Sequence, residues 1–355
     1  MEYLLRAPVI ATAALAVSLS VGITPAAGES PSLKGKTITM ITGDAAGGGT
    51  DTTGRLIASF FAKYLPGQPT VIVRNMPGAG GMTSLNYVTT QTKPDGLTII
   101  MGSTSQADPK NYRRSNAQYD PSKFSYVGGI VRGGYGLLTS VDAIPRLADK
   151  SKPAAIIGSA TGYPRNAMLM AMWGIEYLGW NAKWVTGYPG TNELMLAMDR
   201  GEIEMTTTGD ISELGDRVGS GKFKIISQTG NSVGEKTLPR PDFGEAPVFE
   251  GLMAGKLSGG LAEQAFQYWL AINAVDKYVA LAPDTPPEIH GLYSETYQKV
   301  GADPQFIAQG RAFSDQFVPV AGKDIERRIK TLANTPPEAI DYIKVLLRKQ
   351  GLNIE

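Results

Sequence analysis

The apolar positions between residues 38 and 61 change their spacing within a short stretch. Ile38, Met40 and Ile41 form a short run rich in β-branched residues, which is typical of a buried strand. Glycines follow at 47–49, and the apolar residues between 56 and 61 then recur at helical spacing. The pattern therefore predicts a strand, a glycine loop and a helix in direct succession.

The same order of elements recurs at two further places. Residues 70–90 contain a β-branched run, a glycine loop and a helical pattern, and residues 154–178 repeat this arrangement. Repeated units of this kind are typical of an α/β protein with mostly parallel sheets. In such proteins the ligand binds at the carboxyl ends of the strands.

A helix that starts directly after a glycine loop can bind an anion. Its first backbone N–H groups have no partner within the helix, and the helix dipole places positive charge at the same end. In the first unit, we expect Thr50 to cap the helix and Asp51 to pair with Arg55 one turn later. The alternative is that the glycines only make tight turns, but their recurrence favours an anion-binding cleft.

Composition narrows the class of protein. The chain has 355 residues, enough for two domains with their own cores. Its 34 basic and 33 acidic residues form no blocks of like charge, so nothing supports nucleic-acid binding. It contains no cysteine, which excludes disulfides, cysteine-bound metals and a lipid-anchored lipoprotein.

Residues 1–28 have the pattern of a signal peptide. Arg6 precedes an apolar run at 7–23, and small residues follow at 24–28. We expect cleavage and export to the periplasm, where a protein without cysteine avoids thiol oxidation. The alternative is an uncleaved anchor helix, although the run is short for a membrane span once its Ser and Thr are discounted.

The residues needed for catalysis are mostly missing. His290 is the only histidine, and no G-x-S-x-G pattern occurs. Gly43 and Gly48 have the spacing of a phosphate-binding loop, but Gly49 stands where the lysine is required. The glycine loops also lack the third glycine of a dinucleotide-binding motif. We therefore expect no catalytic residues, no metal and no cofactor, and a binding protein instead of an enzyme.

Several motifs instead resemble one family. The family pattern P-G-G-x-x-D-x-x-[AG]-R is similar to Ala46, Gly47, Gly48, Asp51, Gly54 and Arg55. A second pattern, V-x-N-x-P-G-A-G-G, matches Val73, Asn75, Pro77, Gly78, Ala79, Gly80 and Gly81. Further matches lie at 94–100, 188–191, 201–204 and 282–286. On these motifs the chain resembles the TctC proteins, also called Bug proteins, which are the periplasmic solute-binding proteins of tripartite tricarboxylate transporters.

The resemblance implies a two-lobed periplasmic-binding-protein (Venus flytrap) fold. Residues 34–135 would form the first part of lobe one, 136–255 lobe two, and 256–355 the return to lobe one with the carboxyl-terminal helices. It also implies capture of a small organic carboxylate, held mainly by backbone N–H groups, hydroxyls and water. The ligand would be a dicarboxylate or tricarboxylate, an aromatic acid or an amino acid. The expected partners are this ligand and the membrane permease, with the protein itself a monomer.

We expect ligand-binding residues at the loops of both lobes. They are Asp44, Gly47, Gly48, Gly49, Thr50, Asp51, Asn75, Gly78, Ala79, Gly80, Ser103, Thr104, Ser159, Thr161, Tyr163, Arg165, Tyr188, Gly190, Thr191, Thr208 and Asp210.

Some positions depart from the family pattern. Asp44 stands where an apolar or aromatic residue is usual, and Thr208 stands where Asp is common. Asp44 and Arg165 are either solvated loop charges or direct ligand contacts. If both contact the ligand, the ligand is amphoteric or an aromatic acid. The stretch 257–276 is longer than usual for the family, and the sequence assigns it no role.

Two other functions stay open. A ligand sensor that docks on a signalling receptor would have the same sequence features as a transporter component. An enzyme on the same scaffold is the second alternative, and turnover of a bound ligand would reveal it.

Overall fold

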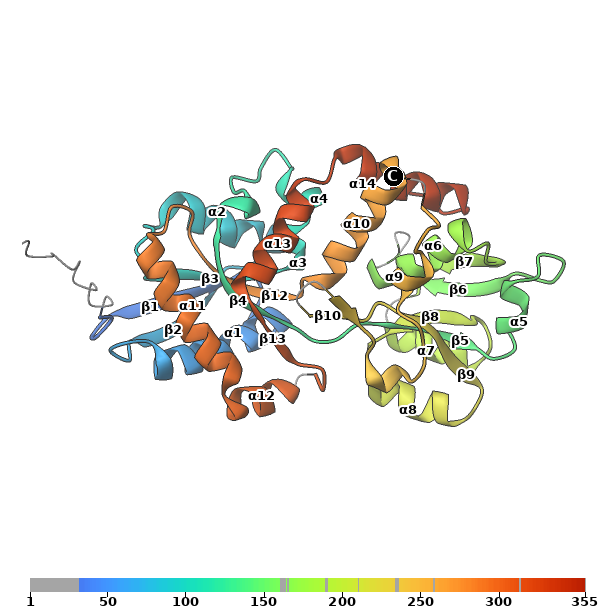
Figure 1. The fold of residues 1–355 in the computed structure, drawn as a ribbon, viewed down its shortest axis with the longest axis horizontal. Coiled ribbons are helices and arrows are strands. Elements are labelled where there is room, and N and C mark those ends of the chain that lie inside the picture. Colours follow the sequence, from blue (N-terminus) through green and yellow to red (C-terminus); the bar gives the residue numbers. More distant parts are fainter. Residues whose placement is uncertain are drawn as a thin grey trace, which may run out of the picture. The chain divides into compact units, whose positions relative to one another are not determined.

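Two β-sheets, each flanked by helices, organise the chain (Figure 1). The computed structural model describes residues 32–159, 164, 166–188, 191–209, 211–233, 236–257, 259–312 and 314–354. Within these ranges, no helix has both the length and the apolar character needed to cross a membrane. The predicted signal peptide, residues 1–28, lies outside the described residues.

The first sheet has six strands in the order β13-β4-β12-β3-β1-β2. Their bounds are β1 (Thr37–Thr42), β2 (Thr70–Asn75), β3 (Thr98–Ser103), β4 (Ser125–Val131), β12 (Lys277–Leu281) and β13 (Val318–Ala321). β1 is parallel to both β2 and β3, with Thr42 opposite Asn75 and Met101. The carboxyl ends of these three strands therefore meet at one edge of the sheet.

The alternation of side chains along β1 gives this sheet two buried faces. Met40 belongs to a cluster with residues of α1, α11 and α12, whereas its neighbour Ile41 belongs to a cluster that includes residues of α2 and α13. Successive strand residues point to opposite faces, so apolar side chains at adjacent positions require helices on both sides. These helices are α1 (Gly49–Tyr64), α2 (Met82–Gln91), α11 (Pro287–Ala302), α12 (Pro304–Arg311) and α13 (Gly322–Ala333).

The second sheet has five strands in the order β7-β6-β8-β5-β9. Their bounds are β5 (Gly136–Ser140), β6 (Ala155–Ser159), β7 (Ala182–Thr186), β8 (Met205–Thr208) and β9 (Phe223–Gln228). Its helices include α5 (Ile144–Leu147), α6 (Leu169–Tyr177), α7 (Thr191–Asp199) and α8 (Ile211–Gly219). The α/β class is confirmed, and the strands and helices of the three predicted units are present; in the third unit, α6 follows a 3₁₀ turn at Asn166–Met168.

The expectation of mostly parallel sheets needs correction, because both sheets are mixed. β6 is parallel to β7 and β8, as β1 is to its neighbours. Every antiparallel pairing within the two sheets involves β4, β5 or β12. β4 and β5 carry the chain directly from one sheet to the other through residues 132–135, and β12 carries it back. Such strands need no helical crossover, which parallel neighbours require.

Short elements complete the connections. β3 is followed by α3 (Thr104–Ala107), α4 (Pro109–Tyr112) and a 3₁₀ turn (Pro121–Lys123). β2 is followed by a 3₁₀ turn at Ala79–Gly81. After β9 come the hairpin strands β10 (Asn231–Val233) and β11 (Lys236–Leu238), a 3₁₀ turn (Pro241–Phe243), α9 (Phe249–Leu252) and α10 (Gly260–Ala274). The last helix is α14 (Pro337–Lys349), which packs against α10 and contacts α6.

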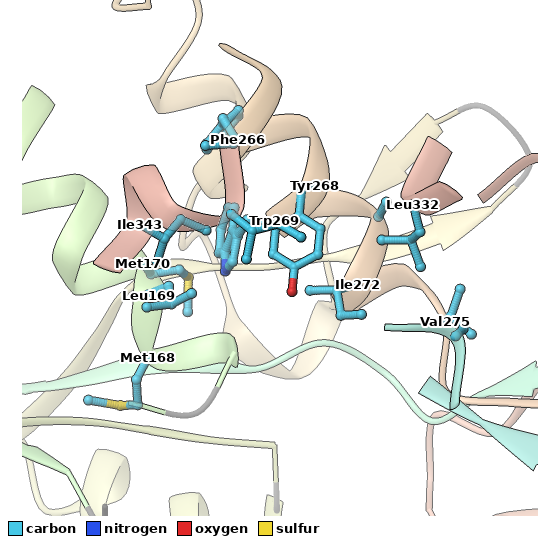
Figure 2. Close-up of a cluster of buried hydrophobic side chains, with 14 of the residues drawn as sticks. Met168, Leu169, Met170, Phe266, Tyr268, Trp269, Ile272, Val275, Leu332 and Ile343 are labelled. Carbon is cyan, nitrogen blue, oxygen red and sulfur yellow. The ribbon is translucent and has the colours of Figure 1, made fainter. Parts of the chain in front are cut away.

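The long stretch 257–276, which the sequence left without a role, contains the core helix α10. Its Trp269 is fully buried, with ring centroids 5.3 Å from Phe266 and 5.7 Å from Phe249. Figure 2 shows these α10 side chains beside residues of α6, such as Met170, and of α14, such as Ile343. α10 therefore supplies aromatic packing that joins three helices from distant parts of the sequence.

Asp303 begins helix α12 and should give the protein a pH-dependent contribution to stability. The Lys63 ammonium at 2.8 Å, the Tyr64 hydroxyl and the Gln305 amide together lower the pKa of the Asp303 carboxyl to about 2. A carboxyl whose pKa is lowered on folding stabilises the protein above its unfolded pKa of about 4, and this stabilisation is lost as the pH falls towards the folded value.

We expect Asp303→Asn to lower the melting temperature at neutral pH, and we expect this difference to shrink as the pH approaches 3. Asparagine also caps helices well, so the variant isolates the charge. An equal difference at both pH values, measured by thermal unfolding, would contradict this account.

Candidate functional site

The two glycine loops of the first sheet meet at its carboxyl edge. They follow β1 and β2, whose ends are in register. The contact is close: a Cβ added to Gly43 of the first loop would lie 2.6 Å from the Cα of Gly81 in the second. The sequence thus correctly predicted that the loops share one edge of a sheet, which is the position where α/β proteins bind ligands.

The first loop leads into α1, but Thr50 does not cap that helix as expected. The helix begins at Gly49 with Gly48 as its cap residue, so Thr50 is already the second helical residue. Its amide donates a 2.9 Å hydrogen bond to the Asp44 carboxylate. The predicted cap lies two residues too late, because the group that binds the first amides of α1 comes from Asp44, outside the helix.

Asp51 holds the first loop in shape from within. It is 1% exposed, and its carboxylate accepts hydrogen bonds from the Gly47 amide at 2.8 Å and from the Asn75 side-chain amide at 2.8 Å. The predicted ion pair with Arg55 is confirmed, with an N–O distance of 2.9 Å. Burial alone would raise the pKa of Asp51, but the hydrogen bonds from Arg55, Gly47 and Asn75 outweigh it and lower the pKa.

Asn75 links the same network to the end of β2. Its amide also donates to the backbone oxygen of Asp44 at 2.9 Å, and its side-chain oxygen accepts from Arg55 at 3.2 Å. The polar groups of Asp51 and Asn75 are therefore engaged within the protein. Their geometry suits residues that position the loop, while Gly47 and Gly49 are exposed at its surface.

The second loop has a backbone that few sequences can adopt. Gly78, Ala79, Gly80 and Gly81 all have positive φ, including +48° at Ala79. A Cβ at Gly81 would come within 2.1 Å of the Gln106 amide nitrogen, so glycine is required there for space as well as for conformation. Strain concentrated in this way is typical of functional loops.

Polar residues follow β3 at the same edge. Ser103 caps α3 in a capping box, and its amide donates to the Gln106 side-chain oxygen at 2.6 Å. The Thr104 hydroxyl donates to the Val275 carbonyl, and the Thr104 amide donates to the Asp276 carbonyl at 3.1 Å. Thr104 therefore connects this edge to the segment that precedes β12.

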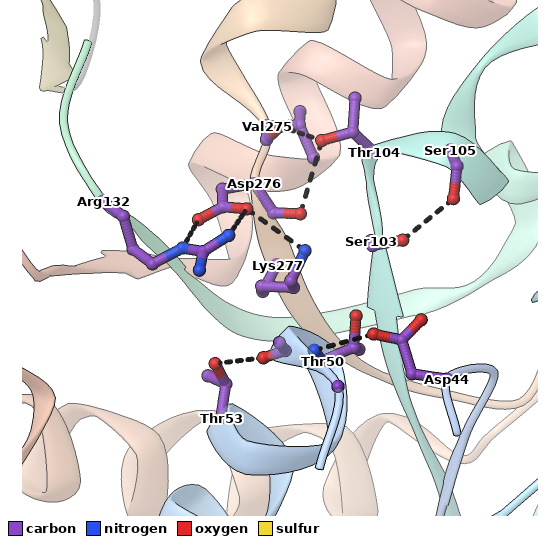
Figure 3. Close-up of polar contacts among 12 residues, drawn as sticks. Asp44, Thr50, Thr53, Ser103, Thr104, Ser105, Arg132, Val275, Asp276 and Lys277 are labelled. Atoms are coloured by element: carbon purple, nitrogen blue, oxygen red, sulfur yellow. Dashed lines mark hydrogen bonds and ion pairs between the residues drawn. The ribbon is translucent and has the colours of Figure 1, made fainter. Parts of the chain in front are cut away.

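Three charged residues that sequence reasoning missed lie beside this edge (Figure 3). Arg132 follows β4, and its guanidinium binds the Asp276 carboxylate through two hydrogen bonds of 2.5 and 3.0 Å. Lys277, at the start of β12, lies 3.2 Å from the same carboxylate. Arg132 is also near the start of α1, since its Nη1 would lie 3.7 Å from a Cβ at Gly49.

The charges of this cluster stabilise one another. Hydrogen bonding to Asp276 raises the pKa of Arg132. Burial alone would raise the pKa of Asp276, but Arg132 and Lys277 lower it overall. Arg132 and Asp276 are 144 positions apart in the chain, so no local pattern connects them. The only signal in the sequence was a cation at the start of the glycine-rich crossing segment 132–135.

Some of the expected residues of the second sheet also lie at strand ends. Ser159 ends β6 and Thr208 ends β8; both are buried, and the two strands are parallel neighbours. Tyr188 follows β7 and is half-buried, and partial burial raises the pKa of its hydroxyl. Thr191 begins α7. Thr161, Tyr163, Arg165, Gly190 and Asp210 lie outside the described residues.

Arg240 is a further residue that was not predicted from the sequence. Its side chain is 1% exposed, and Nη1 donates to the carbonyls of Gly134 at 3.1 Å and Gly209 at 2.8 Å. Gly209 directly follows Thr208, and Gly134 lies in the crossing segment. Arg240 therefore fixes the backbone of Gly209, the residue that follows β8.

The described residues offer little reaction chemistry. His290 lies in α11, half-buried, with its Nε2 2.9 Å from the Tyr126 carbonyl oxygen. Among the residues with defined positions, no group of three or more His, Asp or Glu side chains converges as a metal site would. What the edge presents is a set of backbone groups, hydroxyls and paired charges, which is suited to binding.

Comparison with known proteins identifies the family. Residues 54–240, more than half of the chain, match the family model for TctC, the tripartite tricarboxylate transporter family receptor. The chain belongs to the TctC family. The resemblance predicted from the motifs is thus confirmed, and TctC proteins are periplasmic solute-binding proteins.

Similar proteins agree with this assignment. A TctC solute-binding protein from Polaromonas has a TM-score of 0.64 and 18% identity, covering 88% of this chain and 98% of that one. A protein of R. palustris, solved with adipate, has a TM-score of 0.52 and 17% identity over 89% and 98% of the two chains. These likenesses confirm the two-lobed binding-protein fold.

A sequence relative covers a smaller region. A Cupriavidus necator protein described as "UPF0065 protein in gbd 5'region" is 32% identical over 135 residues. The match spans 37% of this chain and 39% of the relative. TctC proteins and their structural neighbours are binding proteins, so a binding role is the function that the family supports.

Proposed function

We propose that this chain captures a small organic carboxylate in the periplasm and delivers it to the permease of a tripartite tricarboxylate-type transporter. The observation that carries the proposal is the meeting of three strand ends and two glycine loops at one edge of the first sheet. Exposed backbone groups at the start of a helix, next to hydroxyls, suit a carboxylate without requiring a dedicated salt bridge.

The proposed ligand contacts divide into two groups. Backbone groups at 49 and 78–80, with the Ser103 hydroxyl, would contact the ligand from the first lobe, whereas the Gly47 and Gly48 amides already donate to Asp51 and to the Ala45 carbonyl. Ser159, Tyr188 and Thr208, with the loops at 160–165 and 189–191, would contact it from the second. Asp51 and Asn75 would act indirectly, because their polar groups already hold the first loop.

The chemistry of the edge and one structural neighbour support a dicarboxylate as the ligand. The R. palustris protein was solved with adipate, a dicarboxylate. Dicarboxylates are therefore the first class to test, followed by tricarboxylates, aromatic acids and amino acids. A ligand present at about 100 times its Kd should stabilise the protein by about 2.7 kcal/mol, which thermal shift readily detects. Failure of all four classes to raise the melting temperature would count against the proposal.

Asp44 should weaken the binding of an anionic ligand at this edge. Its carboxylate occupies the Thr50 amide at the start of α1 and places a negative charge there. Asp44→Asn keeps the shape and an acceptor oxygen but removes the charge. We expect a dicarboxylate identified in the screen to bind about tenfold more tightly to the variant, as measured by calorimetry at fixed ionic strength.

Asp95→Asn is the matched control for this prediction. Asp95 precedes β3 at the other end of the strand and accepts a hydrogen bond from the Leu97 amide. Its replacement should leave the affinity unchanged. Weaker binding to Asp44→Asn would contradict the prediction and would indicate that Asp44 contacts a positively charged group of the ligand.

A further inference from the structure

A cavity lies away from the carboxyl edges of both sheets. It has a volume of about 290 Å³ and lies between the β10–β11 hairpin, α10 and α13, with Glu250 of α9 also in its wall. None of its lining residues belongs to the proposed carboxylate site. Three of them are cations, Lys236, Arg327 and Arg328, and only Glu250 is acidic.

Arg328 is the unusual residue in this cavity. It is 6% exposed, and its guanidinium donates to the carbonyls of Ala274 at 2.6 Å and Ser232 at 3.0 Å. No carboxylate of a described residue lies within 4.0 Å of its nitrogens, whereas Arg240, the other arginine buried among the described residues, pairs with Asp242 at 3.0 Å. Burial lowers the pKa of Arg328, and neighbouring Arg327 adds to this effect, while the Asp324 carboxylate opposes it.

A buried positive charge of this kind is costly unless an anion accompanies it. Carbonyl oxygens satisfy some of its N–H groups, but they carry only partial negative charge. Glu250, the one acid in the wall, is exposed and forms no ion pair with Arg328; its carboxylate accepts a hydrogen bond from the Thr237 hydroxyl at 2.6 Å. The cavity opens directly onto Arg328, so an anion from solution can reach it.

We propose that this cavity is a binding site for a small oxyanion, a phosphate or carboxylate group, with Arg328 at its base. Lys236 provides further positive charge around it, and Arg327, which pairs with Asp324 at 2.9 Å, also lines it. The volume suits a small anion or the charged end of a metabolite, and guanidinium groups match the geometry of both oxyanions.

The cavity also joins two connecting segments of the chain. Ser232 belongs to β10, which follows the second sheet, and Ala274 ends α10 just before β12 returns to the first. Arg328 bonds to both, from a helix that packs against β4. An anion bound to Arg328 would therefore be held by segments that connect the two sheets.

Titration of the full chain with inorganic phosphate, in a buffer without other oxyanions, tests this proposal. We expect saturable binding by calorimetry, weakened about tenfold in Lys236→Gln and in Arg327→Gln. These variants leave the buried bonds of Arg328 intact, whereas Arg328→Gln risks the fold. Lys330→Gln is the matched control: Lys330 lies on the same helix, is paired with Glu326 and does not line the cavity.

Two further titrations distinguish binding in this cavity from binding at the proposed carboxylate site. Asp44→Asn should leave the phosphate affinity of the cavity unchanged. Parallel titration with succinate shows whether the cavity prefers phosphate or carboxylate, and binding of either that depends on Lys236 supports the proposal.

Three results would overturn it. They are the absence of saturable binding by both anions, binding that responds to Asp44 but not to Lys236, and a short acidic peptide binding far more tightly than either anion.

Discussion

Trp269→Ala should destabilise the protein by about 4 kcal/mol, which is the largest single effect that the structure predicts. Trp269 is fully buried in α10, and its ring packs against Phe249 and Phe266. Removing the indole loses its apolar burial and leaves a cavity among helices that cannot all close around it (Figure 2). Urea unfolding of the full chain, followed by circular dichroism, measures the loss.

Leu261→Ala is the control on the same helix. Leu261 is 44% exposed, so its truncation should change the free energy of unfolding by less than about 0.5 kcal/mol. A comparable loss of unfolding free energy in both variants would mean that the loss does not depend on burial of the side chain. A negligible loss in Trp269→Ala would show that α10 is not part of the core.

Arg240→Met should cost about 3 kcal/mol and also weaken ligand binding. The methionine fills much of the space but leaves the carbonyls of Gly134 and Gly209 without their buried donor and removes the bond to Asp242. Because Gly209 follows Thr208, the end of β8 should lose its fixed position. We expect reduced stability in urea and a higher Kd for the carboxylate ligand.

Two comparisons sharpen this second prediction. Arg240→Lys should recover only part of the stability, because an ammonium lacks the planar fork that reaches several acceptors at once. Arg200→Met provides the surface control, since Arg200 is 67% exposed and its ion pair with Glu202 is long, at 3.7 Å. If Arg240→Met proves no worse than Arg200→Met, the buried bonds of Arg240 do not support the structure.

The repeating elements of the fold could be predicted from the sequence because they depend on local patterns. The change from a strand to a helical period after residue 42 reflects burial on both faces of β1, which leaves a direct trace in the chain. The direction of β12 left no such trace. Its antiparallel pairing with β3 and β4 joins segments more than 140 residues apart, and a short apolar strand looks the same in either direction.

The candidate site was predictable to a similar extent. The glycine loops were found because positive φ values select glycine in the sequence itself. The ion pair between Asp51 and Arg55 was found because its members are one helical turn apart. Arg132 with Asp276, and Arg240 with Gly209, could not be found in this way, since only the folded chain brings them together.

The core around α10 also bears on how the protein unfolds. One continuous apolar cluster contains Ile41 of the first sheet, Ile157 of the second sheet and Trp269 of α10, which belongs to neither sheet. A fragment limited to either sheet would leave part of this cluster facing water. The two sheets should therefore melt together as one cooperative unit, so that a chain cut in the crossing segment loses both halves.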